Sequence, residues 1–292
     1  MLKTQDIRIR DPYVVVHNGS YYMYRSENNS IWVHKGNNLA SWEEATRVYT
    51  LSDNSWGCAD LWAPEVHFYR EKFYMFLSLL GKNGLRGTEI SVSDTPDGIF
   101  TPISSLPATP SDRSCIDGSL YVEDGVPYIV YSADWPHNYD PRSDAYIGEI
   151  WAMQLSVDLC SSAGEPFLLF RSNQAVCSKE PNLCKLDGKD VVRFGSDAPF
   201  VQRLSNGVLY LTWSPMPKDT YIVAAAISES GRINGPWKHL DKPLFSENGG
   251  HAMFFDALDG SRKMCIHHPE CWGKERALFL NVKEEDKKLI IV

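Results

Sequence analysis

Apolar and polar residues alternate over stretches of four to eight positions along most of the chain, and no stretch has a helical period. Each alternating stretch is broken by a short turn and then resumes with an aromatic-rich stretch, which is the pattern of a β-hairpin. The turns contain Asn18-Gly19, Asp124-Gly125, Asn206-Gly207 and Asp259-Gly260. This pattern predicts an all-β protein that is built from antiparallel hairpins.

The hairpin pattern recurs five times, and each copy is followed by a further apolar run and a weaker last strand. Three copies align without gaps and two need extra turn residues, and successive copies start 52, 54, 80 and 54 residues apart. Propeller blades repeat at about 40–50 residues. The sequence therefore predicts one five-bladed β-propeller over residues 1–292, with about four antiparallel strands per blade and an insertion in the third. The copies start at Asp11, Ala63, Asp117, Asp197 and His251.

Composition narrows the classes of protein that remain. Apolar residues make up 43% of the chain and charged residues 23%, which excludes a disordered chain. A net charge of −8 disfavours a nucleic-acid partner. The chain contains no run of 18 apolar residues, so no membrane span is predicted. The first residues lack the apolar segment of a secretory signal. With seven scattered cysteines and no Cys-x-x-Cys pair, we expect reduced thiols and a cytoplasmic protein.

The predicted fold brings the starts of the five blades together, because the first strand of each blade runs beside the central channel. Asp11, Asp117, Asp197 and His251 would then share one small cavity. Carboxylates crowded in a desolvated site have pKa values that are pushed apart, so one can act as an acid and another as a base. Glycoside hydrolysis needs such a pair. A non-catalytic carbohydrate-binding propeller is the alternative, although burying several carboxylates for binding alone is costly.

Short motifs surround the five predicted blade starts: Arg10-Asp11-Pro12, Trp62-Ala63-Pro64-Glu65, Ile116-Asp117-Gly118-Ser119, Asp197-Ala198-Pro199-Phe200 and Gly249-Gly250-His251. In order and spacing they resemble glycoside hydrolase family 43, and the resemblance extends from Arg10 to about Val282. Members of that family are five-bladed propellers that hydrolyse arabinofuranosides, β-xylosides and some galactosides with inversion of configuration. The resemblance implies the same fold and the same type of reaction for this chain.

The resemblance also implies roles for three carboxylates. Asp11 would be the general base that deprotonates the attacking water, and Asp117 would hold the acid and raise its pKa. Asp197 stands where the family has its general acid, which is usually a glutamate in a Glu-Gly-Pro context. Aspartate is one methylene shorter, and a misplacement of about 1 Å can cost about a hundredfold in rate. Asp134 and Glu149 therefore remain as alternative proton donors.

Other residues are candidates for binding the substrate or an ion. Trp62 and Trp135 would stack on a sugar ring, with core packing as the alternative. Arg276 would reach the channel and bind sugar hydroxyls, or else lie solvated in a loop. His251 matches a channel histidine that often lies near calcium or another cation, although one imidazole cannot hold calcium and the ion would be mostly hydrated. We expect that no cofactor is required.

Together with these residues, the resemblance implies an inverting glycosidase that releases single sugars from the non-reducing ends of plant-type oligosaccharides, as an α-L-arabinofuranosidase, a β-D-xylosidase or both. An endo-acting arabinanase or xylanase is the alternative, which a cytoplasmic location disfavours because polymers do not enter cells. A phosphorylase would need basic residues at the blade starts, and none aligns there. The expected partner is an oligosaccharide, with neither nucleic acid nor membrane. The polar stretches 134–144 and 173–190 are expected to be loops that rim the pocket.

Overall fold

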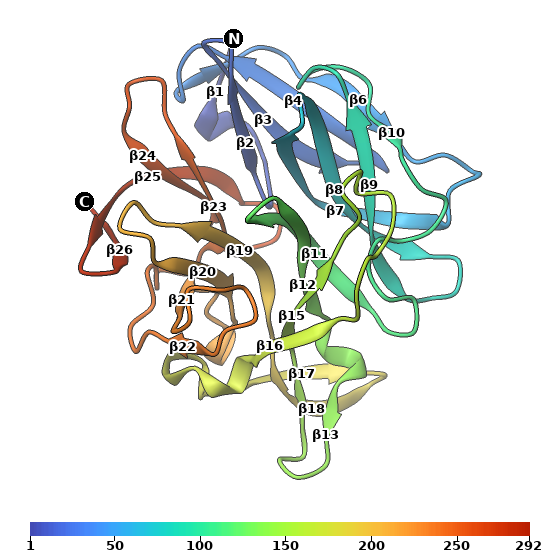
Figure 1. The fold of residues 1–292 in the computed structure, drawn as a ribbon, viewed down its shortest axis with the longest axis vertical. Coiled ribbons are helices and arrows are strands. Elements are labelled where there is room, and N and C mark those ends of the chain that lie inside the picture. Colours follow the sequence, from blue (N-terminus) through green and yellow to red (C-terminus); the bar gives the residue numbers. More distant parts are fainter.

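A computed structural model describes all 292 residues and places five antiparallel sheets of four strands around a common axis (Figure 1). The predicted five-bladed β-propeller is confirmed. The helical segments are five 3-10 turns of three residues each, and none has the length and apolar character needed to cross a membrane.

The blades follow one another along the chain, and each is complete within one stretch of sequence. In chain order they consist of β2 (Tyr13–His17), β3 (Ser20–Glu27), β4 (Ser30–Gly36) and β6 (Thr46–Thr50); β7 (Gly57–Tyr69), β8 (Lys72–Gly81), β9 (Arg86–Ser93) and β10 (Thr101–Pro102); β11 (Cys115–Glu123), β12 (Val126–Ala133), β15 (Glu149–Gln154) and β16 (Phe167–Arg171); β19 (Asp197–Arg203), β20 (Leu209–Ser214), β21 (Ala224–Ser228) and β22 (Trp237–His239); β23 (Gly250–Asp256), β24 (Arg262–His268), β25 (Arg276–Glu285) and β26 (Lys288–Ile291). Two further short strands, β1 (Leu2–Lys3) and β5 (Ser41–Trp42), pair with each other.

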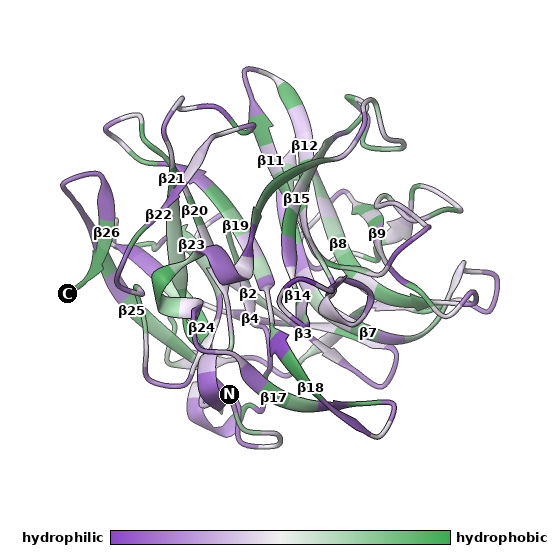
Figure 2. Cartoon of the chain, turned by 90° about the horizontal axis from the view of Figure 1, so that it is seen from below, coloured by the Kyte–Doolittle hydropathy of each residue, from purple (hydrophilic) through white to green (hydrophobic).

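Turn residues and buried strand faces explain the regular blades. Asn18 and Gly19 both have positive φ, and so do Asp124 and Gly125, which is the backbone of the two-residue turns that join antiparallel strands. Large apolar side chains from facing sheets fill the space between neighbouring blades, and Figure 2 shows the apolar stretches along strands such as β12 and β21. The largest fully buried side chains include Trp42, Trp213, Tyr24, Tyr131 and Tyr210.

The long insertion in the third blade forms a sixth sheet, here called the accessory sheet. It consists of β13 (Tyr139–Asp140), β14 (Ala145–Ile147), β18 (Lys189–Phe194) and β17 (Asn182–Leu186), in that order, and β14 and β18 are parallel. The expectation that the stretches 134–144 and 173–190 are loops is therefore wrong in part. Strands β13 and β14 are only two and three residues long, and the parallel pair β14–β18 joins segments distant in sequence, so local alternation does not indicate the sheet. The hairpin β17–β18, which turns at Asp187-Gly188, is local but matches no blade repeat.

The ring is closed by packing between the first and last blades, because no strand is shared between them. In this seam, Phe255 contacts Tyr21 and Phe279, with ring centroids 6.2 Å apart in both pairs. The backbone N–H of Ile9 donates a hydrogen bond to the carbonyl of Glu275 at 3.1 Å. The seam also places residues near Asp11 against the last blade, which positions one wall of the central cavity.

Candidate active site

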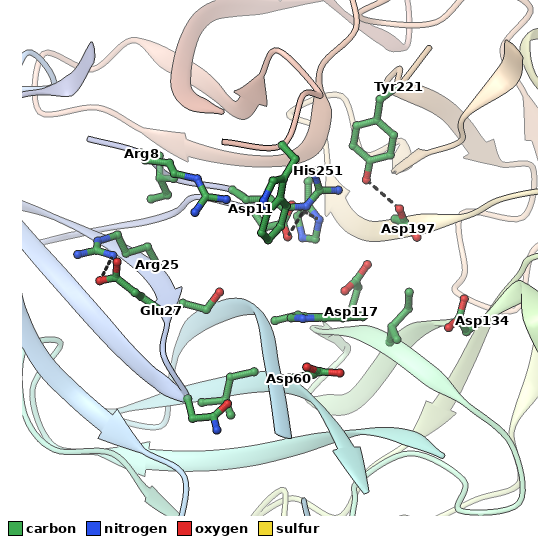
Figure 3. A pocket seen from close by; sticks show the side chains of 18 of the residues that line it. Arg8, Asp11, Arg25, Glu27, Asp60, Asp117, Asp134, Asp197, Tyr221 and His251 are labelled. Carbon is green, nitrogen blue, oxygen red and sulfur yellow. Dashed lines mark hydrogen bonds and ion pairs between the residues drawn. The ribbon is translucent and has the colours of Figure 1, made fainter. Parts of the chain in front are cut away.

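One cavity of about 890 Å³ opens at the propeller axis and is lined by residues of all five blades (Figure 3). Asp11, Asp117, Asp197 and His251 all line it, so the predicted convergence occurs. Trp62 and Trp135 line it as well. The other lining residues are Arg8, Ile9, Arg10, Arg25, Ser26, Glu27, Asn28, Asn29, Asp60, Leu61, Ile116, Asp134, Pro136, Tyr221 and Trp272.

Asp197 stands one residue before the position at which the sequence alignment put it. A β-bulge interrupts the first strand of blades two to five, near its start in blades three to five and at Ala63, inside β7, in blade two. The first residue of each of these bulges has positive φ. In the fourth blade that residue is Ala198, so Ala198-Pro199 corresponds to Ala63-Pro64. The sequence comparison of the blades places Asp197, rather than Ala198, at the position of Asp11 and Asp117. The equivalent residues, with φ between 46° and 58°, are Asp11, Ala63, Asp117, Ala198 and His251.

Three basic side chains surround Asp11. The Nδ1 atoms of His251 and His267 lie 3.1 and 3.0 Å from its Oδ1, and Nε of Arg10 lies 3.7 Å from its Oδ2. Burial favours the neutral acid, but these neighbours outweigh burial and hold the pKa of Asp11 well below its usual range. Asp11 is therefore ionised at neutral pH, as a general base must be.

Two of these side chains, Arg10 and His267, also contact Glu270. Nη1 of Arg10 lies 2.8 and 2.9 Å from the two carboxylate oxygens of Glu270, and Nε2 of His267 lies 2.6 Å from one of them. Asp11, His267, Glu270 and Arg10 thus form a closed ring of charges across the seam. Sequence reasoning missed this ring, because His267, near the end of β24, and Glu270, in the connection after it, carry no motif that marks them.

Asp197 has the opposite character. Its carboxylate accepts a hydrogen bond of 3.1 Å from the hydroxyl of Tyr221, and the Tyr221 ring stacks on His267 at 5.3 Å between centroids. Burial, reinforced by the nearby charge of Asp117, raises the pKa of Asp197 to about 7. A large fraction of Asp197 is therefore protonated near neutral pH. Tyr221 was also missed, since a tyrosine before an apolar strand is no distinctive signal.

Asp117 lies between the two in Figure 3 and is almost fully buried. It accepts a hydrogen bond of 3.0 Å from the N–H of Ala198, and its own N–H donates to the hydroxyl of Ser78 at 2.7 Å. Burial and the charge of Asp11 raise the pKa of Asp117 to about 6, although His251 opposes the shift. Asp117 thus binds the backbone of Ala198, the residue that follows Asp197 in the chain.

The two alternative proton donors differ in their positions. Asp134 lines the cavity, and burial together with the charge of Asp197 raises its pKa to about 6. Glu149 does not line the cavity; its carboxylate accepts hydrogen bonds from Nε of Arg171 at 2.8 Å and from Nε1 of Trp151 at 2.9 Å. Asp134 therefore remains a candidate acid, whereas Glu149 is a structural residue of the third blade.

The candidate sugar-binding residues also separate. Trp62 is 41% exposed, and the guanidinium of Arg86 lies 3.4 Å from its ring centroid. Trp135 is half-buried at the cavity wall. Arg276 does not line the cavity; its Nε donates to the carbonyl of Gln5 at 2.7 Å, so the prediction that it binds sugar hydroxyls is corrected. A strand-start arginine in the last blade was not distinguishable by sequence from one that faces the channel.

His251 lies against Asp11, and its expected contact with a hydrated cation stays a prediction. The Asp11 carboxylate outweighs the effect of burial and raises the pKa of His251 to about 10, so its ring is a cation at neutral pH. No group of three or more histidine, cysteine, aspartate or glutamate side chains is arranged to hold a metal ion. His251 is the ion-pair partner of Asp11.

Fold and site together define a propeller with an acidic catalytic-type cavity, and comparison with known proteins identifies the family. The model of Glycosyl hydrolases family 43 matches residues 5–281, so the chain belongs to this family.

Solved structures and curated relatives agree with this assignment. The endo-arabinase from Bacteroides thetaiotaomicron VPI-5482 is 33% identical, with a TM-score of 0.89 and 98% of each chain covered. A thermostable family-43 glycoside hydrolase is 26% identical, with a TM-score of 0.80 over 97% of this chain and 92% of that chain. The alpha-L-arabinofuranosidase 43 of Humicola insolens is 20% identical over 287 residues, which cover 88% of this chain and 54% of that protein. The chain spans about half the length of the curated relatives it matches.

Proposed function

We propose that this chain hydrolyses α-L-arabinofuranosides, β-D-xylosides or both with inversion of configuration, and that it releases single sugars from the non-reducing ends of oligosaccharides. One observation carries the proposal: an ionised carboxylate, Asp11, and a carboxyl that is protonated near neutral pH, Asp197, line the same cavity. General acid–base hydrolysis of a glycoside requires this pair of protonation states.

The reaction proceeds in one displacement. Asp11 takes a proton from a water molecule while the water oxygen forms a bond to the anomeric carbon. The bond between this carbon and the leaving oxygen breaks, and Asp197 gives its proton to that oxygen. Asp11 ends protonated and Asp197 ends ionised, and exchange with solvent restores both. Asp117 orients Asp197 through the Ala198 N–H. His251, His267 and Arg10 hold Asp11 ionised.

The substrate class is supported by the family and by the size of the cavity. Relatives named as arabinofuranosidases include the extracellular exo-alpha-(1->5)-L-arabinofuranosidase of Streptomyces avermitilis, which is 21% identical over 283 residues. A volume of about 890 Å³ falls within the range of about 300–1,000 Å³ typical of pockets for small ligands. Such a pocket suits a short oligosaccharide.

A second candidate is endo-acting arabinanase activity. The observation that favours it is the likeness to the Bacteroides endo-arabinase, which covers nearly the whole of both chains. Linear α-1,5-arabinan distinguishes the two candidates. Release of single arabinose units from the first minutes supports the exo-acting enzyme, whereas a mixture of oligosaccharides supports the endo-acting one.

The test of the proposed function uses nitrophenyl α-L-arabinofuranoside and β-D-xyloside. We expect Asp11→Asn to lower kcat/KM by about 10²–10⁴-fold, because the water is no longer deprotonated. Asp241→Asn, a change at an exposed aspartate outside the cavity, serves as the matched control and should match the wild type.

Proton NMR of the first product then reports the stereochemistry. An α-L-arabinofuranoside should yield β-L-arabinofuranose, and a β-D-xyloside should yield α-D-xylose. Retention of the anomeric configuration would contradict the single displacement. Binding of oligosaccharides without release of nitrophenol would indicate a carbohydrate-binding propeller that does not catalyse hydrolysis.

A further inference from the structure

The accessory sheet is directly continuous with one wall of the cavity. Its first strand follows the turn Trp135–His137, and its strand β18 leads within three residues to Asp197. The N–H of Gly148 and the hydroxyl of Ser172 donate hydrogen bonds of 2.7 and 2.8 Å to the carbonyl of Phe194, the last residue of β18. The sheet is thereby fixed to the third blade beside Asp197.

Two side chains of this sheet contact the ring of Trp135. The ring of Tyr146, from β14, meets Trp135 edge-on with centroids 6.1 Å apart and planes at 86°. The guanidinium of Arg193, from β18, lies 5.0 Å from the Trp135 ring centroid. A residue on a turn is therefore given a defined orientation at the cavity wall by two neighbouring strands of the insertion.

Arg193 is unusual among the arginines near the cavity because no carboxylate lies within ion-pair distance of it. Its Nη2 contacts Oδ1 of Asn182 at 3.2 Å and Sδ of Met216 at 3.1 Å, and its buried Nε has no partner. A guanidinium with only neutral partners retains its attraction for the face of an aromatic ring and for nearby oxygens. Its charge also acts on Asp197, whose pKa it lowers against the larger effects of burial and Asp117.

The chemistry of the proposed reaction identifies what lies against Trp135. The acid gives its proton to the leaving oxygen, so the leaving sugar must lie next to Asp197. Asp134, which precedes Trp135, lies on the same side of the cavity as Asp197, and Asp11 lies away from both (Figure 3). Trp135 therefore borders the space that the leaving sugar occupies, and an indole ring can pack against the apolar face of a sugar.

We propose that the accessory sheet forms a binding site for the leaving-group sugar, with Trp135 as its platform and with Arg193 and Tyr146 as residues that position the platform. The proposal rests on the proposed function. It assigns a specificity role to the insertion in the third blade. The insertion selects the leaving-group sugar, whereas the channel residues select the non-reducing-end sugar whose anomeric carbon is attacked.

The experiment compares a substrate that reaches this site with one that does not. In arabinofuranosyl fluoride the leaving group is a fluoride ion, which is too small to contact Trp135. In α-1,5-arabinobiose the leaving group is a sugar. Xylosyl fluoride and xylobiose form a second pair of this kind. We expect Trp135→Ala to lower kcat/KM for the disaccharide at least tenfold more than for the fluoride. Trp135→Phe should recover part of the difference, because it retains an aromatic face. Arg193→Lys should show a smaller preferential loss, because lysine retains the charge but not the planar contact.

Leu183→Ala is the matched control, since Leu183 lies on β17 of the same sheet, is 72% exposed and does not line the cavity. It should leave both rates unchanged. Equal losses on both substrates in Trp135→Ala, or no loss on either, would overturn the leaving-sugar site while the proposed function stood. A wild-type protein that cleaves neither substrate would overturn the proposed function itself. If Trp135→Ala does not fold, Trp135→Phe and Arg193→Lys decide the question. If both variants have the wild-type ratio of kcat/KM for the disaccharide to kcat/KM for the fluoride, the proposal is overturned.

Discussion

At the scale of single residues, the site depends on two aspartates in contrasting surroundings. Asp11 contacts two histidines and lies near an arginine, whereas Asp197 is buried beside another carboxyl and bonded to a neutral hydroxyl. The same side chain is therefore ionised in one place and largely protonated in the other. Sequence motifs indicate both residues. Their surroundings come partly from Tyr221, His267 and Glu270, which occupy no blade-start position and carry no motif.

The pKa values of these two aspartates predict how activity depends on pH. Asp197 must be protonated to act, so kcat/KM should fall as the pH rises through about 7. Asp11 must be ionised, and its pKa lies below its usual range, so activity should persist when the pH falls to values that protonate ordinary carboxylates. A pH profile of kcat/KM on the aryl glycoside measures both limits.

Tyr221→Phe tests the assignment of the alkaline limit. The lost hydroxyl donates to the carboxylate and so favours its ionised form; without it, the pKa of Asp197 should rise and the alkaline limit should move to higher pH. Tyr139→Phe is the control, because Tyr139 is half exposed on the accessory sheet and bonds to Asp144 instead. A limit that stays in place, or moves to lower pH, would transfer the acid role away from Asp197.

At the scale of elements, the connection between β24 and β25 supplies a residue that supports the site. It carries Glu270, which lies 2.6 Å from His267 and is bonded to Arg10 in the first blade. Turn dipeptides such as Asn18-Gly19 allowed the hairpins to be located from sequence. Sequence reasoning did not find the pairing of β14 with β18 or the contacts of this connection, because in both cases the partners lie in segments distant along the chain.

Glu270→Gln should lower kcat by about ten- to a hundredfold with little change in KM. Arg10 and His267 would lose their shared counter-charge, and Asp11 would lose the fixed geometry that orients the attacking water. Steady-state kinetics on the aryl glycoside separate the two constants. Glu247→Gln, at an exposed glutamate outside the cavity, is the control. A rise in KM without loss of kcat would show that Glu270 supports sugar binding instead.

At the scale of the whole molecule, the repeats in the sequence were sufficient to predict the number of blades and their order. They could not predict the relative placement of the first and last blades, which depends on contacts between the two ends of the ring. There the rings of Tyr21, Phe255 and Phe279 pack together, and the charged ring around Asp11 crosses the same seam. Ring closure and the environment of the base are therefore coupled.

Phe255→Ala should lower the free energy of unfolding by about 3–5 kcal/mol, because it removes a buried aromatic side chain from the seam. Denaturant unfolding followed by circular dichroism measures the change. Ile99→Ala, at a side chain that is 70% exposed, should change it by less than about 0.5 kcal/mol. A similarly small effect of Phe255→Ala would show that the seam does not contribute to global stability.

The five equivalent positions at the start of the blades share one left-handed backbone conformation but carry aspartate, alanine or histidine. The architecture therefore tolerates different side chains at the place where chemistry occurs, since the bulge does not depend on which of them is present. Over evolutionary time, a duplicated blade can acquire or lose a reactive group by a single codon change while the scaffold survives. Descendants of one ancestral propeller can in this way keep their shape and diverge in the reactions they perform.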